Sequence, residues 1–179
     1  MPDEPTVQPL EGSSSGSVLD DLPSANARYA ADFALGQLGS PPSRHLAVVA
    51  CMDARILPLA LFGLEPGDAH VIRNAGGRVT DDVIRSLLVS VHVLGVRAIA
   101  VVHHTECGMA RYSDGELAGI VEEATGQSAA GIAFQAIDDS AKAMGEDLER
   151  IRSSKLFPPG IEVRGYVYDV RSGLVSETA

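Results

Sequence analysis

The chain has 179 residues, of which 45% are hydrophobic and 21% charged, and its formal net charge is −10 at neutral pH. This length predicts one domain with enough apolar residues for a sizeable core. The negative charge argues against nucleic acid as a partner, because phosphate binding needs a basic face. The sequence contains neither a long apolar stretch nor a basic N-terminus followed by an apolar run. We therefore expect no membrane association, no secretory signal and a cytoplasmic protein.

The N-terminal residues have a composition of their own. Residues 1–24 are rich in Pro, Ser and Gly, and the first 25 residues contain no Lys or Arg. Such a segment cannot bury a core, so we expect a disordered acidic tail over 1–24 and a single α/β domain over 25–179. Tyr29, Phe33 and Leu38 recur among alanines, which predicts a short amphipathic helix over Ala27–Leu38.

Strand and helix patterns alternate through the rest of the chain. Apolar, β-branched runs at 45–51, 69–73 and 98–104 are typical of buried parallel strands. Helical patterns cover 56–64, 80–94, 116–125 and 138–152. Residues 162–170 alternate as a strand, and a turn at 171–173 leads into a short strand at 174–176. The order predicts a mostly parallel sheet with helices on both faces and an antiparallel edge strand.

The two cysteines of the chain stand where predicted strands end. Cys51 closes the first strand, and Cys107 follows the third, with His104 three residues before it. In an open parallel sheet, ligands bind beyond the carboxyl ends of the strands. Two thiolates and an imidazole there would form a soft, three-ligand zinc site with one position left for water. His103 and His104 face opposite ways on a regular strand, so one of them is the ligand, and the spacing favours His104.

Two other interpretations of these residues were weighed. Free cysteines are often small buried hydrophobes, and histidines at strand ends are often only polar. A redox-active cysteine pair is the second alternative, but the Cys-x-x-Cys spacing is missing. Two cysteines at two strand ends, combined with a His-x-x-Cys spacing, favour a metal site over both alternatives.

Asp53 and Arg55 follow Cys51 at a spacing of two residues. On an extended segment they face the same side, and a bidentate pair would keep Asp53 ionised and fix its direction. An ordinary loop ion pair would contribute little to stability if exposed. Beside a metal ligand, we favour the functional interpretation.

These residues resemble the signature of the β-class carbonic anhydrases. The resemblance rests on Cys51-x-Asp53-x-Arg55 and His104-x-x-Cys107, and on the neighbouring segments 50–55, 72–76 and 103–108. It extends over about residues 45–168 and is to the compact actinobacterial type. It implies a zinc lyase that reversibly hydrates carbon dioxide to bicarbonate and a proton.

The resemblance also implies roles for individual residues. Cys51, His104 and Cys107 would hold zinc, and Asp53 with Arg55 would form a gate. In a closed state Asp53 itself would be the fourth ligand. The resemblance further implies a homodimer or a dimer of dimers as the assembly. Because the chain has no Trp, a regulatory bicarbonate site that uses this residue in some family members is not expected.

The chemistry of zinc predicts the mechanism. Zinc lowers the pKa of bound water towards ~7, so zinc-bound hydroxide exists at neutral pH and Asp53 would accept its hydrogen bond. Two thiolates donate more negative charge than imidazoles, so we expect activity to rise into alkaline pH. By resemblance, Ala75 and Gly76 are expected to line the substrate pocket, although a tight turn at 74–77 also explains the glycines.

Two other functions remain open from the sequence. A hydrolase of carbon disulfide or carbonyl sulfide would share the fold and the site, and the motifs do not separate it from an anhydrase. A non-catalytic zinc- or bicarbonate-binding protein would keep Asp53 permanently on the metal as the fourth ligand. We rank this function last because Arg55 has the means to hold Asp53 off the ion.

Overall fold

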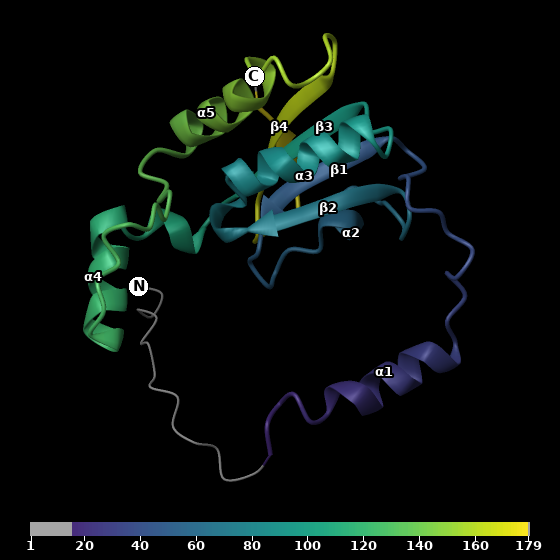
Figure 1. Cartoon of the computed structure of the whole chain (residues 1–179), viewed down its shortest axis with the longest axis horizontal. Helices are drawn as coiled ribbons and strands as arrows, with labels where there is room; N and C mark the ends of the chain where they lie inside the picture. Colours follow the sequence, from purple (N-terminus) through teal and green to yellow (C-terminus); the bar gives the residue numbers. More distant parts are fainter. Residues whose placement is uncertain (1–15, 179) are drawn as a thin grey trace. The chain divides into compact units, whose positions relative to one another are not determined.

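The computed structural model describes residues 16–178 and divides the chain into two units (Figure 1). The first unit ends at Leu38 and contains helix α1 (Leu22–Ala31), none of whose residues is buried. The helix predicted over 27–38 therefore begins and ends earlier than expected. Pro23 lies in its first turn, where proline is favoured, although the sequence analysis assigned this residue to the tail. The predicted disordered tail overlaps the start of α1, and its residues 1–15 lie outside the described part.

The second unit, Gly39–Ala179, is built on a five-stranded sheet with the order β2-β1-β3-β4-β5. The strands are β1 (Leu46–Cys51), β2 (Ala69–Asn74), β3 (Ala98–His104), β4 (Glu162–Tyr168) and β5 (Val175–Glu177). The first four are parallel to one another, and β5 pairs with β4 in the antiparallel sense. The predicted mixed sheet with an antiparallel edge strand is confirmed.

Helices join these strands, and side chains cap the first turns of α3, α4 and α5. They are α2 (Pro58–Leu61), α3 (Asp81–His92), α4 (Asp114–Thr125) and α5 (Ser140–Arg152), with 3-10 turns η1 (Ala75–Gly77) and η2 (Gly108–Ala110). Thr80 caps α3 as predicted, by accepting the backbone N–H of Val83. The helix predicted over 56–64 is shorter at both ends: it starts at Pro58, and Gly63, with φ 62°, turns the chain two residues after its end. None of the described helices could cross a membrane.

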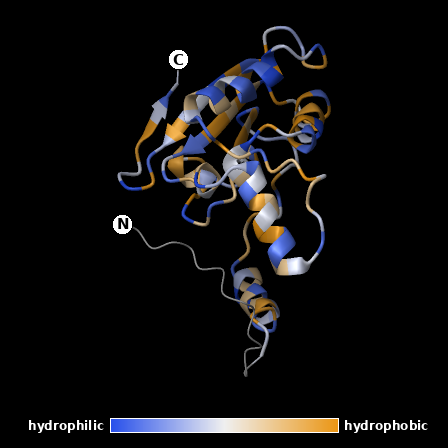
Figure 2. Cartoon of the chain, turned by 90° about the vertical axis from the view of Figure 1, so that its left-hand side faces the viewer, coloured by the Kyte–Doolittle hydropathy of each residue, from blue (hydrophilic) through white to orange (hydrophobic). Residues whose placement is uncertain are grey.

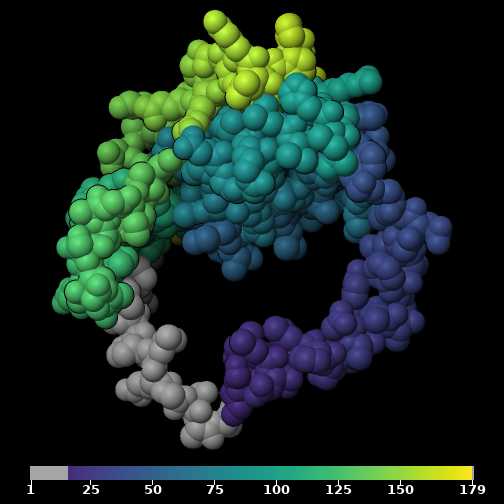
Figure 3. Space-filling view, in the orientation of Figure 1, coloured from purple at the N-terminus to yellow at the C-terminus, as the bar shows by residue number. Residues whose placement is uncertain are grey.

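The two faces of the sheet bury alternate side chains of the same strands. On one face, residues such as Val49 and Val101 pack against α3 and α5. On the other, Val48 and Val102 pack against the segment that carries α2. Figure 2 shows apolar colour along the strands between these layers, and Figure 3 shows the C-terminal part packed against the teal residues of α3. Helices thus lie on both faces, as predicted, and leave the carboxyl ends of β1 and β3 at one common edge.

Candidate metal centre

The ends of two neighbouring strands bring the predicted ligands together. Strand β1 ends at Cys51 and strand β3 ends at His104, and the two strands are parallel and adjacent. The chain then reverses through Glu106, whose φ is 56°, and returns the side chain of Cys107 to the same place. The ligand atoms of Cys51, His104 and Cys107 lie within 4.8 Å of one another, and all three residues are buried. Within residues 16–178 this is the group of side chains that could share a metal ion.

The imidazole of His104 has a defined tautomer. Its Nδ1 lies 2.9 Å from the carbonyl oxygen of Thr105, which can only accept, so Nδ1 carries the hydrogen. The Nε2 atom then presents a lone pair, and it is buried without a hydrogen-bond partner. A buried polar atom left unpaired costs free energy. A cation at this position would remove that cost.

The two cysteine side chains shift each other's pKa in opposite directions. The thiol of Cys107 donates to the sulfur of Cys51, as do the backbone N–H groups of Asp53 and Gly76, and these contacts lower the pKa of Cys51. The same interaction, with burial, raises the pKa of Cys107. A divalent cation bound by the two sulfurs would favour loss of both protons. Two thiolates and a neutral imidazole are ligands that fit zinc.

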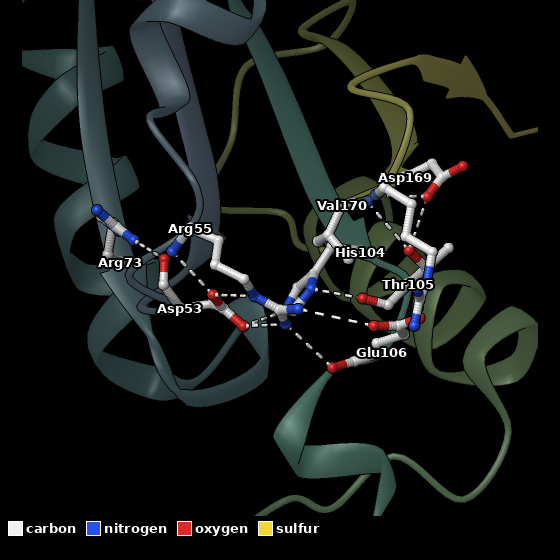
Figure 4. A network of polar contacts seen from close by, with 9 residues as sticks. Asp53, Arg55, Arg73, His104, Thr105, Glu106, Asp169 and Val170 are labelled. Carbon is white, nitrogen blue, oxygen red and sulfur yellow. Dashed lines mark hydrogen bonds and ion pairs between the residues drawn. The ribbon is translucent and has the colours of Figure 1, made fainter. Parts of the chain in front are cut away.

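Asp53 and Arg55 form the bidentate pair that their spacing predicts (Figure 4). Nε of Arg55 donates to Oδ1 over 3.0 Å, and Nη2 donates to Oδ2 over 2.7 Å. The guanidinium thereby holds the pKa of Asp53 well below its ordinary value. Oδ2 of Asp53 lies 3.9 Å from Nε2 of His104. The carboxylate is thus next to the cluster, and each of its oxygens accepts a hydrogen bond from the Arg55 side chain.

Arg73 at the end of β2 supports this segment, and the sequence analysis did not single it out. Its Nε donates to the carbonyl oxygen of Cys51 over 3.0 Å, and its Nη2 donates to that of Asp53 over 2.7 Å. A signal was present, since Arg73 stands at the carboxyl end of a predicted strand beside the strand that carries Cys51. One side chain therefore fixes the backbone at both residues.

The turn η1 passes directly beside the ligand strands. A Cβ on Gly77, whose φ is 68°, would lie 2.8 Å from the nitrogen of Cys51 and 2.9 Å from the oxygen of Val102. Only glycine tolerates both that approach and that backbone conformation. Ala75 and Gly76, the predicted pocket residues, belong to the same turn at this edge of the sheet. The glycines therefore form a tight turn, and this turn lies beside the cluster.

His103 points away from the cluster, as the alternation along β3 predicts. Its Nε2 lies 3.0 Å from Oδ2 of Asp147, a buried carboxylate of α5. Asp147 also accepts from Nε of Arg78 over 2.8 Å and from the backbone N–H of Val79 over 2.9 Å. This buried polar cluster is not evident from the sequence, because Asp147 belongs to a helix whose other charged residues are exposed. The cluster ties α5 and the segment after η1 to the strand that carries His104.

Comparisons with known proteins agree with this geometry. A family model described as carbonic anhydrase matches residues 46–158. A β-carbonic anhydrase 1 from Mycobacterium tuberculosis is 40% identical over 161 residues, which are 90% of this chain and 98% of the relative. A carbon disulfide hydrolase from Acidianus sp. is 35% identical over 165 residues, covering 79% of this chain and 81% of the relative. A solved structure of a carbonic anhydrase from Streptococcus mutans has a TM-score of 0.87 at 37% identity, over 92% of this chain and 99% of that chain.

The family model covers most of the second unit, and the mycobacterial relative is matched over almost its full length. The chain therefore belongs to the β-class carbonic anhydrase family of enzymes.

Proposed function

We propose that this protein reversibly hydrates carbon dioxide to bicarbonate and a proton, using zinc held by Cys51, His104 and Cys107. The observation that carries this proposal is the buried Cys–His–Cys group beside a carboxylate that an arginine holds in place. The mycobacterial and streptococcal relatives, which are named carbonic anhydrases, support carbon dioxide as the substrate.

The donor set assigns the ligands. The sulfurs of Cys51 and Cys107 would bind zinc as thiolates, and His104 would bind through Nε2, the nitrogen that has no hydrogen-bond partner. Zinc bound there would supply Lewis-acid activation of water, because the metal lowers the pKa of water towards ~7.

Asp53 is the residue that would act on the water. Its pKa lies well below the ordinary value because Arg55 donates to both of its oxygens. The carboxylate therefore stays ionised, and able to accept hydrogen bonds, as long as these contacts persist. From its place beside Nε2 of His104 it would accept a hydrogen bond from a water at the site and aim an oxygen lone pair at carbon dioxide. Arg55 would hold Asp53 away from the three ligands.

Stopped-flow measurement of carbon dioxide hydration by the zinc-loaded protein tests the proposal, with Cys107→Ser as the control that removes one ligand. We expect fast, zinc-dependent turnover that rises from neutral to alkaline pH, because two thiolates weaken the acidity that zinc confers on water. Absence of turnover with zinc firmly bound would contradict the proposal. A rate that does not change with pH would contradict the argument from the thiolates.

Hydrolysis of carbon disulfide is the second candidate, and the similarity to the Acidianus carbon disulfide hydrolase supports it. The same protein preparation should be assayed with carbon disulfide. Turnover of carbon disulfide with negligible hydration of carbon dioxide would favour this function. Permanent ligation of the metal by Asp53, as a non-catalytic protein requires, is disfavoured by the bidentate contact with Arg55.

The proposed assembly is a homodimer or a dimer of dimers. Strand β2 is an edge of the sheet, and an apolar groove of about 390 Å³ beside it is lined by residues that include Leu57, Leu64 and Val71. Val71 on this edge strand and Leu57 beside it are exposed, and exposed apolar side chains at a sheet edge favour pairing with another chain. Sedimentation equilibrium of the full chain should give at least twice the monomer mass, and a monomer at all concentrations would contradict the assembly.

A further inference from the structure

The guanidinium of Arg55 is held on two different edges. Its Nε and Nη2 atoms bind Asp53, as described above. Nη2 also donates to the carbonyl oxygen of Glu106 over 3.3 Å, and Nη1 lies 3.7 Å from Oε2 of the same residue (Figure 4). A guanidinium carries five N–H donors in a planar fork, so both partners are bound at once. Glu106 therefore supports the contact between Arg55 and Asp53 and does not compete with it.

Glu106 is itself fixed at both its main chain and its side chain. Its backbone lies between His104 and Cys107 and adopts a left-handed φ of 56°, which is uncommon for a residue other than glycine. Its Oε1 accepts from Nε of Arg171, in the turn between β4 and β5. The carboxylate is thus shared between two arginines, with one oxygen facing each.

The turn that carries Arg171 is joined to the ligand loop by a second contact. The backbone N–H of Val170 donates to Oγ1 of Thr105 over 3.1 Å, and this hydroxyl lies 3.3 Å from Oδ1 of Asp169. Oδ1 of Asp169 also accepts the backbone N–H of Arg171 over 2.9 Å. The backbone at Arg171 is therefore anchored beside Thr105 and Glu106.

The position of Arg55 decides where Asp53 can go. Oδ2 of Asp53 is already 3.9 Å from Nε2 of His104, so the carboxylate has only to leave the guanidinium to reach the metal ligands. A guanidinium anchored by Asp53 alone could follow the carboxylate. A guanidinium that is also bound by Glu106 stays in place and retains it.

We propose that Glu106, oriented by Arg171, is a positioning residue that keeps Arg55 where it holds Asp53 away from the metal ligands. This inference rests on the function proposed above for the Asp53–Arg55 pair and adds a regulatory contact to it. Because the side chain of Arg171 is 74% exposed and that of Glu106 38% exposed, solvent weakens their ion pair and the expected effects are modest.

The test uses the full chain loaded with cobalt(II), whose visible absorption reports its ligands. Azide is titrated into the wild type, Glu106→Gln, Arg171→Gln and the double variant. Azide needs the coordination position that Asp53 would take, so its affinity measures how often that position is available. Arg164→Gln is the matched control, because Arg164 is a half-exposed arginine that pairs with Glu162 and Glu177 away from the site.

We expect Glu106→Gln to weaken azide binding by about two- to five-fold. Arg171→Gln should act in the same direction with a smaller effect, and Arg164→Gln should match the wild type. The double variant should be no weaker than Glu106→Gln alone, because Arg171 acts through Glu106. Addition of Asp53→Asn to Glu106→Gln should restore azide affinity, since an amide is a poor ligand for the metal.

Unchanged azide affinity in Glu106→Gln would overturn the inference, as would a loss that persists after Asp53→Asn is added, because general damage to the site would then explain it. A protein that shows the expected azide pattern but does not hydrate carbon dioxide would support the inference and contradict the proposed function. A protein that hydrates carbon dioxide with no response to Glu106→Gln would overturn the inference alone.

Discussion

A few hydrogen bonds set the protonation and orientation of the side chains at this site. The carbonyl oxygen of Thr105 accepts the hydrogen of Nδ1 of His104, so Nε2 keeps its lone pair and, with the two sulfurs, could bind one metal ion. Arg55 keeps Asp53 ionised and directs it at the same time. The ligand set and the acceptor beside it therefore have different electrostatic surroundings, although they lie within a few ångströms of each other.

At this scale, Asp53→Asn should keep zinc but lose activity. The amide preserves the shape of the carboxylate and removes its charge, so kcat/KM should fall by about 10²-fold or more. Zinc content and stopped-flow rates measure the two effects separately. The control is Asp82→Asn, which alters an exposed carboxylate paired with Arg85 on α3. Full turnover by Asp53→Asn would refute the role of this residue.

Two structural elements, η1 and α5, pack against the strands that carry Cys51 and His104. The turn η1 lies against β1 and β3, at a distance that excludes any side chain on Gly77. Helix α5 carries Asp147, whose carboxylate binds His103 of β3 and Arg78 after η1. Each element can be tested by one substitution with a control on a helix.

Gly77→Ala should lower the free energy of unfolding by more than about 2 kcal/mol, because the new methyl group meets backbone atoms of Cys51 and Val102 in a left-handed conformation. It should also weaken zinc binding, since the backbone of Cys51 has to shift. Urea denaturation and a zinc titration measure the two effects. Gly119→Ala, inside α4 with no atom near its added methyl group, should instead stabilise the protein by about 0.5–1 kcal/mol. Equal stability of Gly77→Ala and the wild type would contradict the argument.

Asp147→Ala should destabilise the protein by about 3–5 kcal/mol, because it leaves the buried guanidinium of Arg78 without its main partner. The backbone N–H of Val79 would also lose its acceptor. Urea denaturation measures the difference. Glu149→Ala, which alters an exposed residue of the same helix, should change stability by no more than about 0.5 kcal/mol. If the two variants were equally stable, the buried cluster would have no structural importance.

For the whole molecule, several carboxylates make folding sensitive to acid. The pKa values of Asp68, Glu116 and Asp169 are lowered because each carboxylate accepts a backbone N–H at a turn or a helix start. A lowered pKa in the folded state means that the ionised form stabilises the fold. This contribution is present above the unfolded pKa of about 4 and is lost as the pH falls through the folded values.

Asp169→Asn should therefore be less stable than the wild type at neutral pH, and the difference should shrink below about pH 4. The amide oxygen can still accept a hydrogen bond, so the comparison isolates the charge. Urea denaturation of both proteins at the two pH values gives the result, and protonation of other groups cancels in the comparison. A difference that is independent of pH would show that ionisation of Asp169 does not contribute.

Much of this protein can be inferred from local sequence. The strands were predicted because apolar, β-branched runs are a local property, and their order along the chain implied a mostly parallel sheet. The association of Cys51, His104 and Cys107 followed from the rule that the carboxyl ends of parallel strands meet at one edge. The sequence prediction was weaker at helix ends, such as the start of α1 near Pro23 and the end of α2 before Gly63.

Tertiary structure alone decided which distant charges meet. Asp147 binds Arg78 and His103, and Arg171 reaches Glu106, across separations of 44 to 69 residues. Periodicity identifies a buried face but does not say which charged residue occupies it or which partner neutralises it. Such pairs form only after the sheet has brought the segments together, because a charge loses its hydration on burial and is retained there only when a partner replaces it.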